Sequence, residues 1–223
     1  MAKTDTSNPA SMVGIWRREF KDRAFLAESL LTLLLFIAVI RICSVVLLFI
    51  EARPGVPLPD PILAHFGPIR LTWFTFSILW TSLIIGICYL LHNPRHLVMG
   101  FEAASLILLF RLITLLLVPL EAPPTIIPMA DPLIVHLGTN GDLVIKDLFF
   151  SGHTSVMFLL FLAAKKNWLK SLFLLGTIAV GIGVTLQHVH YSIDVFVAPF
   201  FAYTSWRIVV RLHEVFRARE NRA

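Results

Sequence analysis

Charged residues are scarce in this sequence. Asp, Glu, Lys and Arg make up 15% of the 223 residues, whereas hydrophobic residues make up 57%. A soluble domain carries about 25% charged residues, so the composition excludes an ordinary soluble protein. The mean hydropathy of +0.80 is typical of a chain that lies largely in a lipid bilayer. The net charge of +5 is modest and the basic residues are dispersed, so no nucleic-acid partner is expected.

Cysteines, linkers and repeats are also few or missing. The two cysteines, Cys43 and Cys88, both lie inside apolar segments, so no disulfide framework is expected. No Gly/Ser-rich stretch or internal repeat divides the chain. The chain begins with a polar stretch rather than an apolar one, which argues against a cleavable signal peptide. We therefore expect one membrane domain, with the first apolar segment as an uncleaved anchor.

Six apolar segments approach the length that a membrane span requires. A hydrocarbon core about 30 Å thick needs about 20 residues of α-helix. The segments are 25–50, 71–91, 97–120, 148–164, 168–186 and 193–210. They predict an all-α polytopic membrane protein with a six-transmembrane-helix bundle. The chain then divides into a cytoplasmic N-terminal segment (1–24), the membrane domain (25–213) and a basic cytoplasmic tail (214–223).

The distribution of Lys and Arg predicts the orientation of this bundle. Most of the 19 basic residues lie before residue 25, near residue 95, at 165–170 and after residue 206. The opposite side holds Arg53, Arg70 and Lys146. Because short cytoplasmic loops are enriched in Lys and Arg, both termini are expected in the cytoplasm. The loops at 51–70, 121–147 and 187–192 are then expected to face outward, to the periplasm, a lumen or the cell exterior. The membrane would be a plasma membrane, or the inner membrane in a bacterium.

Two polar motifs stand at the outer ends of apolar segments. Ser151-Gly152-His153-Thr154 begins the fourth segment, and His188-Val189-His190-Tyr191-Ser192-Ile193-Asp194 begins the sixth. A His and an Asp four residues apart lie about 40° apart around a helix and face one space. The carboxylate can hold one imidazole nitrogen while the other attacks phosphorus, and a second His can serve as acid and base. The pair of motifs therefore predicts covalent phosphoryl transfer in a membrane.

Helix N-termini at the same face would favour a phosphate. Both motifs begin helices that run inward, so their free N–H groups and positive dipole ends face outward. Ser151 and Ser192 are expected to cap these helices. Gly152 is expected to let the backbone come close to a ligand.

Two other interpretations of these residues remain open. His190 and Asp194 could simply satisfy each other at a helix end, although the second motif at the same face argues against this. His153, His188 and His190 with a carboxylate could instead bind zinc. The zinc alternative is weakened because a strand-like His-x-His would point its two side chains apart.

At these motifs the chain resembles a known family. Asp147-Leu148-Phe149-Phe150 followed by the first motif, together with the second motif, resembles the signature pair of the sphingomyelin synthases, a branch of the type 2 phosphatidic acid phosphatase superfamily. Pro57-Leu58-Pro59-Asp60 and Arg111-Leu112-Ile113-Thr114 resemble further segments of that branch. The resemblance runs from about residue 57 to the last helix, and the six-helix plan agrees with it.

The chain also departs from the family pattern. Ile145-Lys146 replaces a Cys-Gly pair before Asp147, and no residue clearly matches a loop glutamate, for which Glu121 and Asp131 are the candidates. The Lys-x6-Arg-Pro motif of the wider superfamily's lipid-phosphate phosphatases is absent. Val184 stands where their Arg would precede the histidine by six residues.

The resemblance implies a role for each matched residue. His190 would be the nucleophile that takes a phosphorylated headgroup from a phospholipid, and Asp194 would orient it. His153 would protonate the leaving oxygen and then activate the acceptor hydroxyl. Asp147 would be a further acidic residue of the site. Neither a metal ion nor another cofactor is implied.

Other residues are predicted to bind substrate. Ser151, Gly152, His188 and Asp60 belong to this group through the motifs. Arg41 and Arg111 lie in the outward halves of their spans, where each buried arginine costs about 2.5–3.5 kcal/mol. One or both are predicted to bind the phosphate in place of the missing Lys and Arg, the alternative being structural partners.

The sequence thus predicts a phosphotransferase that moves a phospho-headgroup from a membrane glycerophospholipid to a ceramide- or diacylglycerol-like lipid alcohol. One alternative is a lipid phosphate phosphatase or phospholipase C-type hydrolase, with water as the acceptor. The other is an inactive lipid-binding relative. Whether the protein forms a homo-oligomer is left open.

Overall fold

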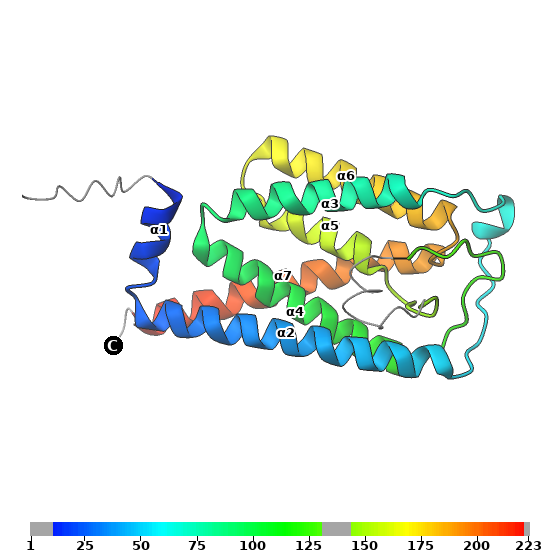
Figure 1. Cartoon of the computed structure of the whole chain (residues 1–223), viewed down its shortest axis with the longest axis horizontal. Coiled ribbons are helices and arrows are strands. Elements are labelled where there is room, and N and C mark those ends of the chain that lie inside the picture. Colours follow the sequence, from blue (N-terminus) through cyan, green and yellow to red (C-terminus); the bar gives the residue numbers. More distant parts are fainter. Residues whose placement is uncertain (1–10, 131–143, 221–223) are drawn as a thin grey trace, which may run out of the picture.

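The computed structural model describes residues 11–130 and 144–220, so Asp131 lies outside the described residues (Figure 1). Over these ranges the chain folds into α-helices without a β-strand, which confirms the all-α class. The helices are α1 (Met12–Glu19), α2 (Arg23–Ala52), α3 (Thr72–Leu90), α4 (Pro94–Leu117), α5 (Gly152–Ala163), α6 (Asn167–Leu186) and α7 (Ser192–Glu220), with a short 3-10 helix η1 (Leu63–His65).

Five of the described helices, α2, α3, α4, α6 and α7, are long and apolar enough to cross a membrane. The predicted fourth span is shorter than expected, because α5 has only 12 residues. Its length of about 18 Å falls short of a hydrocarbon core of about 30 Å. Residues 148–151 are irregular instead of helical, with Phe149 at a φ of 87°. The predicted count of six spans is therefore not confirmed.

Helices also form at both ends of the predicted membrane domain, whose boundaries stay a prediction. Helix α1 forms within segment 1–24, where Ser11 accepts a hydrogen bond from the Gly14 N–H at 3.1 Å. The indole of Trp16 donates to the Leu91 carbonyl at 2.8 Å and fixes α1 against the turn between α3 and α4. At the other end α7 continues to Glu220, so the boundary placed at 213/214 falls within this helix.

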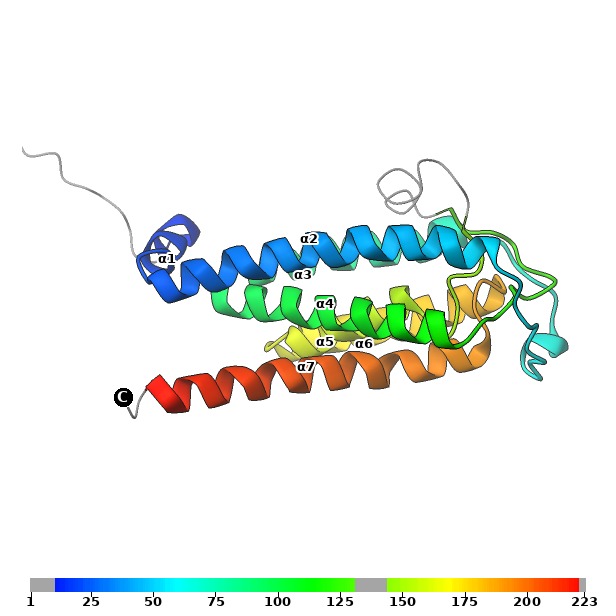
Figure 2. The ribbon, with the colours of Figure 1, turned by 90° about the horizontal axis from the view of Figure 1, so that it is seen from below.

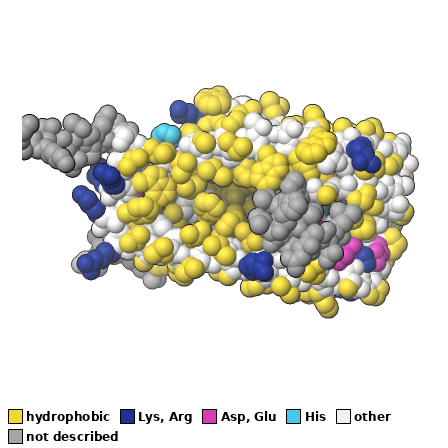
Figure 3. Space-filling model, in the orientation of Figure 1, with side chains coloured by type: hydrophobic (Ala, Val, Ile, Leu, Met, Phe, Trp, Pro, Cys, Tyr) yellow, Lys and Arg dark blue, Asp and Glu magenta, His cyan; other side chains and the backbone are white. Residues whose placement is uncertain are grey.

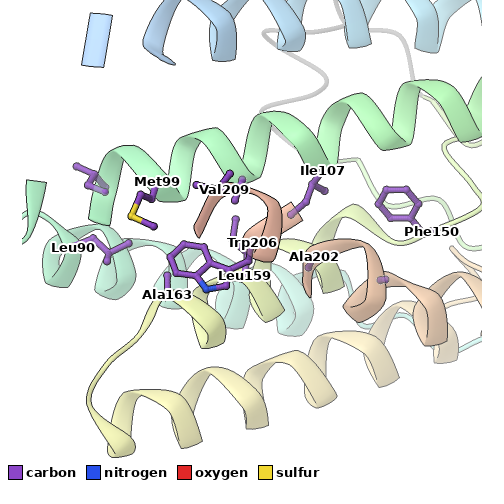
Figure 4. Close-up of a cluster of buried hydrophobic side chains, with 12 residues drawn as sticks. Leu90, Met99, Ile107, Phe150, Leu159, Ala163, Ala202, Trp206 and Val209 are labelled. Atoms are coloured by element: carbon purple, nitrogen blue, oxygen red, sulfur yellow. The ribbon is translucent and has the colours of Figure 1, made fainter. Parts of the chain in front are cut away.

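The short helix α5 lies in the middle of the bundle. It packs against α3, α4, α6 and α7, while α2 packs on the outer side of α4 (Figures 1 and 2). A core of buried side chains fills the space between α4, α5 and α7, with Ile107, Leu159, Ala202 and Trp206 among its members (Figure 4). Enclosure by longer helices compensates for the length that α5 lacks, because its ends need not reach the lipid surface.

The outer surface of the bundle is hydrophobic. Leu31, Leu34 and Val45 of α2 are largely exposed, and apolar side chains cover most of the face drawn in Figure 3 between its two ends. Such a surface is stable only against lipid, which supports an integral membrane protein. Helix α1 and the C-terminal end of α7 lie at one end of the bundle, and the loops before α3, α5 and α7 lie at the other (Figure 1). Which end is cytoplasmic stays a prediction.

The charge asymmetry yields a test of orientation. In a protein with Cys43→Ala and Cys88→Ala, we introduce Leu58→Cys in the loop after α2 or Asn167→Cys at the start of α6. Because basic loops stay in the cytoplasm, a membrane-impermeant maleimide should label residue 58 in intact cells and residue 167 only after permeabilisation. Labelling of both positions from one side would contradict the predicted topology.

Candidate active site

His190 and Asp194 meet at the N-terminus of α7. Nδ1 of His190 lies 3.3 Å from Oδ2 of Asp194, and both residues are buried, with 3% and 0% of their surface exposed. The sequence predicted this pair on one face of a helix, but His190 precedes the helix by two residues. The contact forms through the first turn of α7, in which the Asp194 N–H donates to the Tyr191 carbonyl at 3.0 Å. Oδ2 of Asp194 also accepts from the Tyr191 N–H at 3.2 Å.

The first motif begins α5, as expected, with Ser151 as its cap. The Ser151 hydroxyl accepts hydrogen bonds from the N–H and the hydroxyl of Thr154, at 3.3 and 3.1 Å. The Ser151 N–H donates to the carbonyl of Asp194 at 3.0 Å, which joins the starts of α5 and α7. His153 lies half-buried in the first turn of α5, with its ring 5.9 Å from that of Phe76. The two motifs therefore occupy one corner of the bundle.

Arg111 reaches the same corner from α4. Its buried guanidinium donates to the carboxylate of Asp147 and to the carbonyl of Phe150, and lies 5.4 Å from the centre of the Phe150 ring. A Cβ on Gly152 would lie 3.0 Å from Nη1 of Arg111. The space beside Gly152, expected to admit a ligand, is thus taken by the arginine. Arg111 therefore pairs with a structural partner, Asp147, and its guanidinium also lies beside the N-terminus of α5.

Asp60 holds the loop between α2 and α3 onto α7. Its Oδ2 accepts from the Ser192 N–H at 2.6 Å, and its Oδ1 accepts from the Ser192 hydroxyl at 3.1 Å. Oδ1 also accepts from the N–H groups of Ile62 and Leu63. Burial raises the pKa of Asp60, but the hydrogen bonds from Ser192, Leu63 and Ile62 outweigh it and lower the pKa. The prediction that Ser192 caps α7 was wrong: Ser192 is the first helical residue and Asp60 receives its N–H. Substrate binding by Asp60 stays untested.

His188 is buried on the loop side of the site. Its φ of 56° lies in the left-handed region, and Nδ1 contacts the hydroxyl of Thr125. Its ring packs edge-on against Phe66, with centroids 5.3 Å apart. Burial lowers the pKa of His188, although the nearby Asp60 opposes this. The contacts of the imidazole with Thr125 and Phe66 join loops at this end of the bundle, whereas its predicted role in substrate binding stays untested.

The zinc alternative finds no support in these positions. Within residues 11–130 and 144–220, His153, His188 and His190 do not gather as a set of ligand atoms. Arg41, predicted to share in phosphate binding, lies at an exposed position on α2, and its role stays a prediction. Arg111 contacts Asp147 and Phe150 at this corner of the bundle.

A second set of contacts ties together the loops at this end of the bundle, and the sequence did not predict it. Nζ of Lys146 donates to Oε1 of Glu121 and to the carbonyl of Arg53, each at 2.9 Å. The same Oε1 accepts from the Gly55 N–H at 2.8 Å. The ammonium of Lys146 and the Gly55 N–H lower the pKa of Glu121. The hydroxyl of Tyr191 donates to the Glu121 carbonyl at 2.9 Å, so this network reaches the residue beside His190.

Comparison with protein families matches this part of the chain. Residues 146–211 match the family described as PAP2 superfamily C-terminal. The match supports a place in the type 2 phosphatidic acid phosphatase superfamily. It covers less than a third of the chain but contains Asp147, His153, His190 and Asp194. No curated protein matches the chain. The superfamily match does not distinguish the sphingomyelin synthase branch from others.

The contacts of Asp60 predict a pH-dependent contribution to stability. Asp60→Ala should lower the unfolding free energy by about 0.5–2 kcal/mol at pH 7, as the loss of a helix cap does. Because the pKa of Asp60 in the folded state lies below its ordinary value, this stability is present above the unfolded pKa and disappears as the pH falls through the folded pKa. The gap in melting temperature between wild type and Asp60→Ala, measured in detergent, should narrow below about pH 4.

The exposed Glu214→Ala serves as the control, since Glu214 lies on α7 away from this loop. A difference between wild type and Asp60→Ala that stays constant from pH 7 to pH 3 would contradict a role for the ionised carboxylate.

Proposed function

We propose that this protein transfers a phosphorylated headgroup from a membrane glycerophospholipid to a lipid alcohol, through a phosphohistidine at His190. The superfamily match supports a lipid phosphatase or phosphotransferase activity in general. The observation that carries the proposal is the buried His190–Asp194 contact beside the N-terminus of α5, where His153 and Arg111 also lie.

The first step uses the orientation of His190. With Nδ1–H donated to Asp194, Nε2 keeps its lone pair and can attack phosphorus. A P–N bond forms while the bond between phosphorus and the glycerol oxygen breaks. His153 gives its proton to that oxygen, and diacylglycerol leaves. The histidine that donated the proton is then neutral and ready to act as a base.

Positive charge for the phosphate comes from Arg111 and from the helix end. A guanidinium has five N–H donors, of which the contacts to Asp147 and Phe150 occupy two within the described structure. The remaining donors can bind phosphate oxygens together with the N–H groups at the start of α5. Asp147 fixes the plane of the guanidinium, which keeps these donors oriented before the substrate arrives.

The second step reverses the first. His153 takes the proton of an incoming hydroxyl, whose oxygen attacks phosphorus as the P–N bond breaks and His190 regains its lone pair. A ceramide- or diacylglycerol-like alcohol is the acceptor we favour, because donor and acceptor then both reach the site from the bilayer that surrounds the hydrophobic bundle (Figure 3). Water in place of the alcohol would make the protein a lipid phosphate phosphatase or a phospholipase C-type hydrolase, which the same superfamily match supports equally.

A covalent intermediate distinguishes this mechanism from direct transfer. A brief pulse of purified protein with headgroup-labelled phospholipid, quenched in alkali, should leave acid-labile label on the wild type. His190→Ala should abolish both label and turnover. Asp194→Asn should lower turnover by about 10²–10⁴-fold, because the wrong tautomer is favoured. His153→Ala should slow both steps.

His65→Ala is the matched control, since His65 is an exposed histidine of an outer loop. Release of the label on addition of ceramide or diacylglycerol indicates a transferase, whereas release by water alone indicates a hydrolase. Undiminished turnover by folded His190→Ala protein would refute the proposal.

The geometry of Arg111 makes a separate prediction. Arg111→Lys should lower turnover nearly as much as Arg111→Ala, because one ammonium cannot bind Asp147, the Phe150 carbonyl and a phosphate in a planar arrangement. Arg207→Lys, at an exposed position on α7, should retain wild-type turnover. Full activity of a folded Arg111→Lys protein would show that the planar set of guanidinium N–H donors is not required.

A further inference from the structure

Three titratable side chains converge at the end of the bundle opposite the two motifs. Nε2 of His213 on α7 lies 2.7 Å from Oε2 of Glu102 on α4 and 3.4 Å from Oε1 of Glu28 on α2. Their three ligand atoms all lie within 4.8 Å of one another. Each side chain is about a quarter exposed, so the cluster is largely shielded by the helices that carry it.

Tertiary packing creates this cluster. The residues come from three helices and are far apart in the sequence, with His213 following Glu102 by 111 positions. Ionisable side chains within spans are costly and mark functional positions. The hydroxyl of Thr32 donates to Oε1 of Glu102 at 3.2 Å, which leaves Oε2 directed at His213. A supporting hydrogen bond of this kind orients carboxylate ligands in metal sites.

Taken by themselves, the three side chains do not balance in charge, although Arg217 on α7 acts electrostatically on His213 and Arg95 acts on Glu28. Two carboxylates face one imidazole, so the net charge is −2 with neutral His213 and −1 when it is protonated. The nearest basic residue on α4, Arg95, binds Glu19 at 2.8 Å and Asp22 at 2.9 Å. Its charge is thus already matched by two other acids. A divalent cation would neutralise both glutamates and accept the imidazole lone pair, which brings the cluster to zero net charge.

We infer that Glu28, Glu102 and His213 bind a divalent transition-metal ion of the Zn²⁺ and Mn²⁺ class. One imidazole nitrogen with two carboxylate oxygens suits such ions, with a further position for water. Mg²⁺ and Ca²⁺ prefer oxygen ligands alone, so the histidine argues against them. The ion would connect α2, α4 and α7 at the end away from His190, and therefore stabilises the bundle without entering the proposed transfer.

Metal retention and stability test this site. The full-length protein in detergent is treated with EDTA, desalted, and supplied with ZnCl₂ or MnCl₂. We expect about one ion per chain after removal of the excess, and a melting temperature that rises with metal concentration, because the ion binds only the folded state. Glu102→Gln and His213→Gln should each weaken binding by at least about tenfold.

Glu214→Gln on the same helix is the control and should bind like the wild type, since Glu214 is exposed and contacts Arg211 instead. X-ray absorption of the zinc-loaded wild type avoids any folding defect of the variants. It should report one imidazole and oxygen ligands at about 2.0–2.1 Å. Failure to retain metal, unchanged binding by both variants, or a site with several imidazoles would each overturn the inference. The first result would leave a plain ion pair that holds the three helices.

Discussion

The hydrogen bond from the Ser151 N–H to the Asp194 carbonyl joins the starts of α5 and α7, and the arrangement of the site depends on it. The side chain of Asp194 contacts Nδ1 of His190, and its backbone carbonyl accepts the hydrogen bond from the first motif. Because Ser151 also caps α5, the position of His153 follows from the same contact.

Paired charges surround this contact. Arg111 binds Asp147, Lys146 binds Glu121, and Asp60 receives the first N–H of α7. In a medium of low dielectric an unpaired charge is costly, so these pairs stabilise the loops at this end of the bundle, and under the proposed function they would fix the donors before substrate arrives. Rigid donors are what phosphoryl transfer requires, because they need not reorganise as charge moves in the transition state. The cluster of Glu28, Glu102 and His213 differs in having an excess of negative charge.

Much of the site was predictable from local spacing. Two local patterns indicate helix starts with reactive side chains: Asp194 follows His190 by four positions, and a Ser-Gly-His-Thr sequence stands before an apolar run. The sequence also indicated that Arg111 would contact a polar or charged group, because an arginine inside a membrane span needs such a partner. The length of α5 was not predictable, since hydropathy does not distinguish the irregular residues 148–151 from a helical turn. The cap of α7 was also missed, because Asp60 is 132 residues from Ser192.

The sequence by itself determined that the chain is helical and membrane-embedded, and which residues could carry phosphoryl chemistry, because hydrophobic period, length and short-range spacing are local properties. Only the tertiary structure decided that Arg111 fills the space beside Gly152 and that Lys146 binds Glu121. It also decided that Glu28, Glu102 and His213 meet. These contacts join helices and loops far apart in the chain, and the packing of α2, α4, α5 and α7 sets their distances.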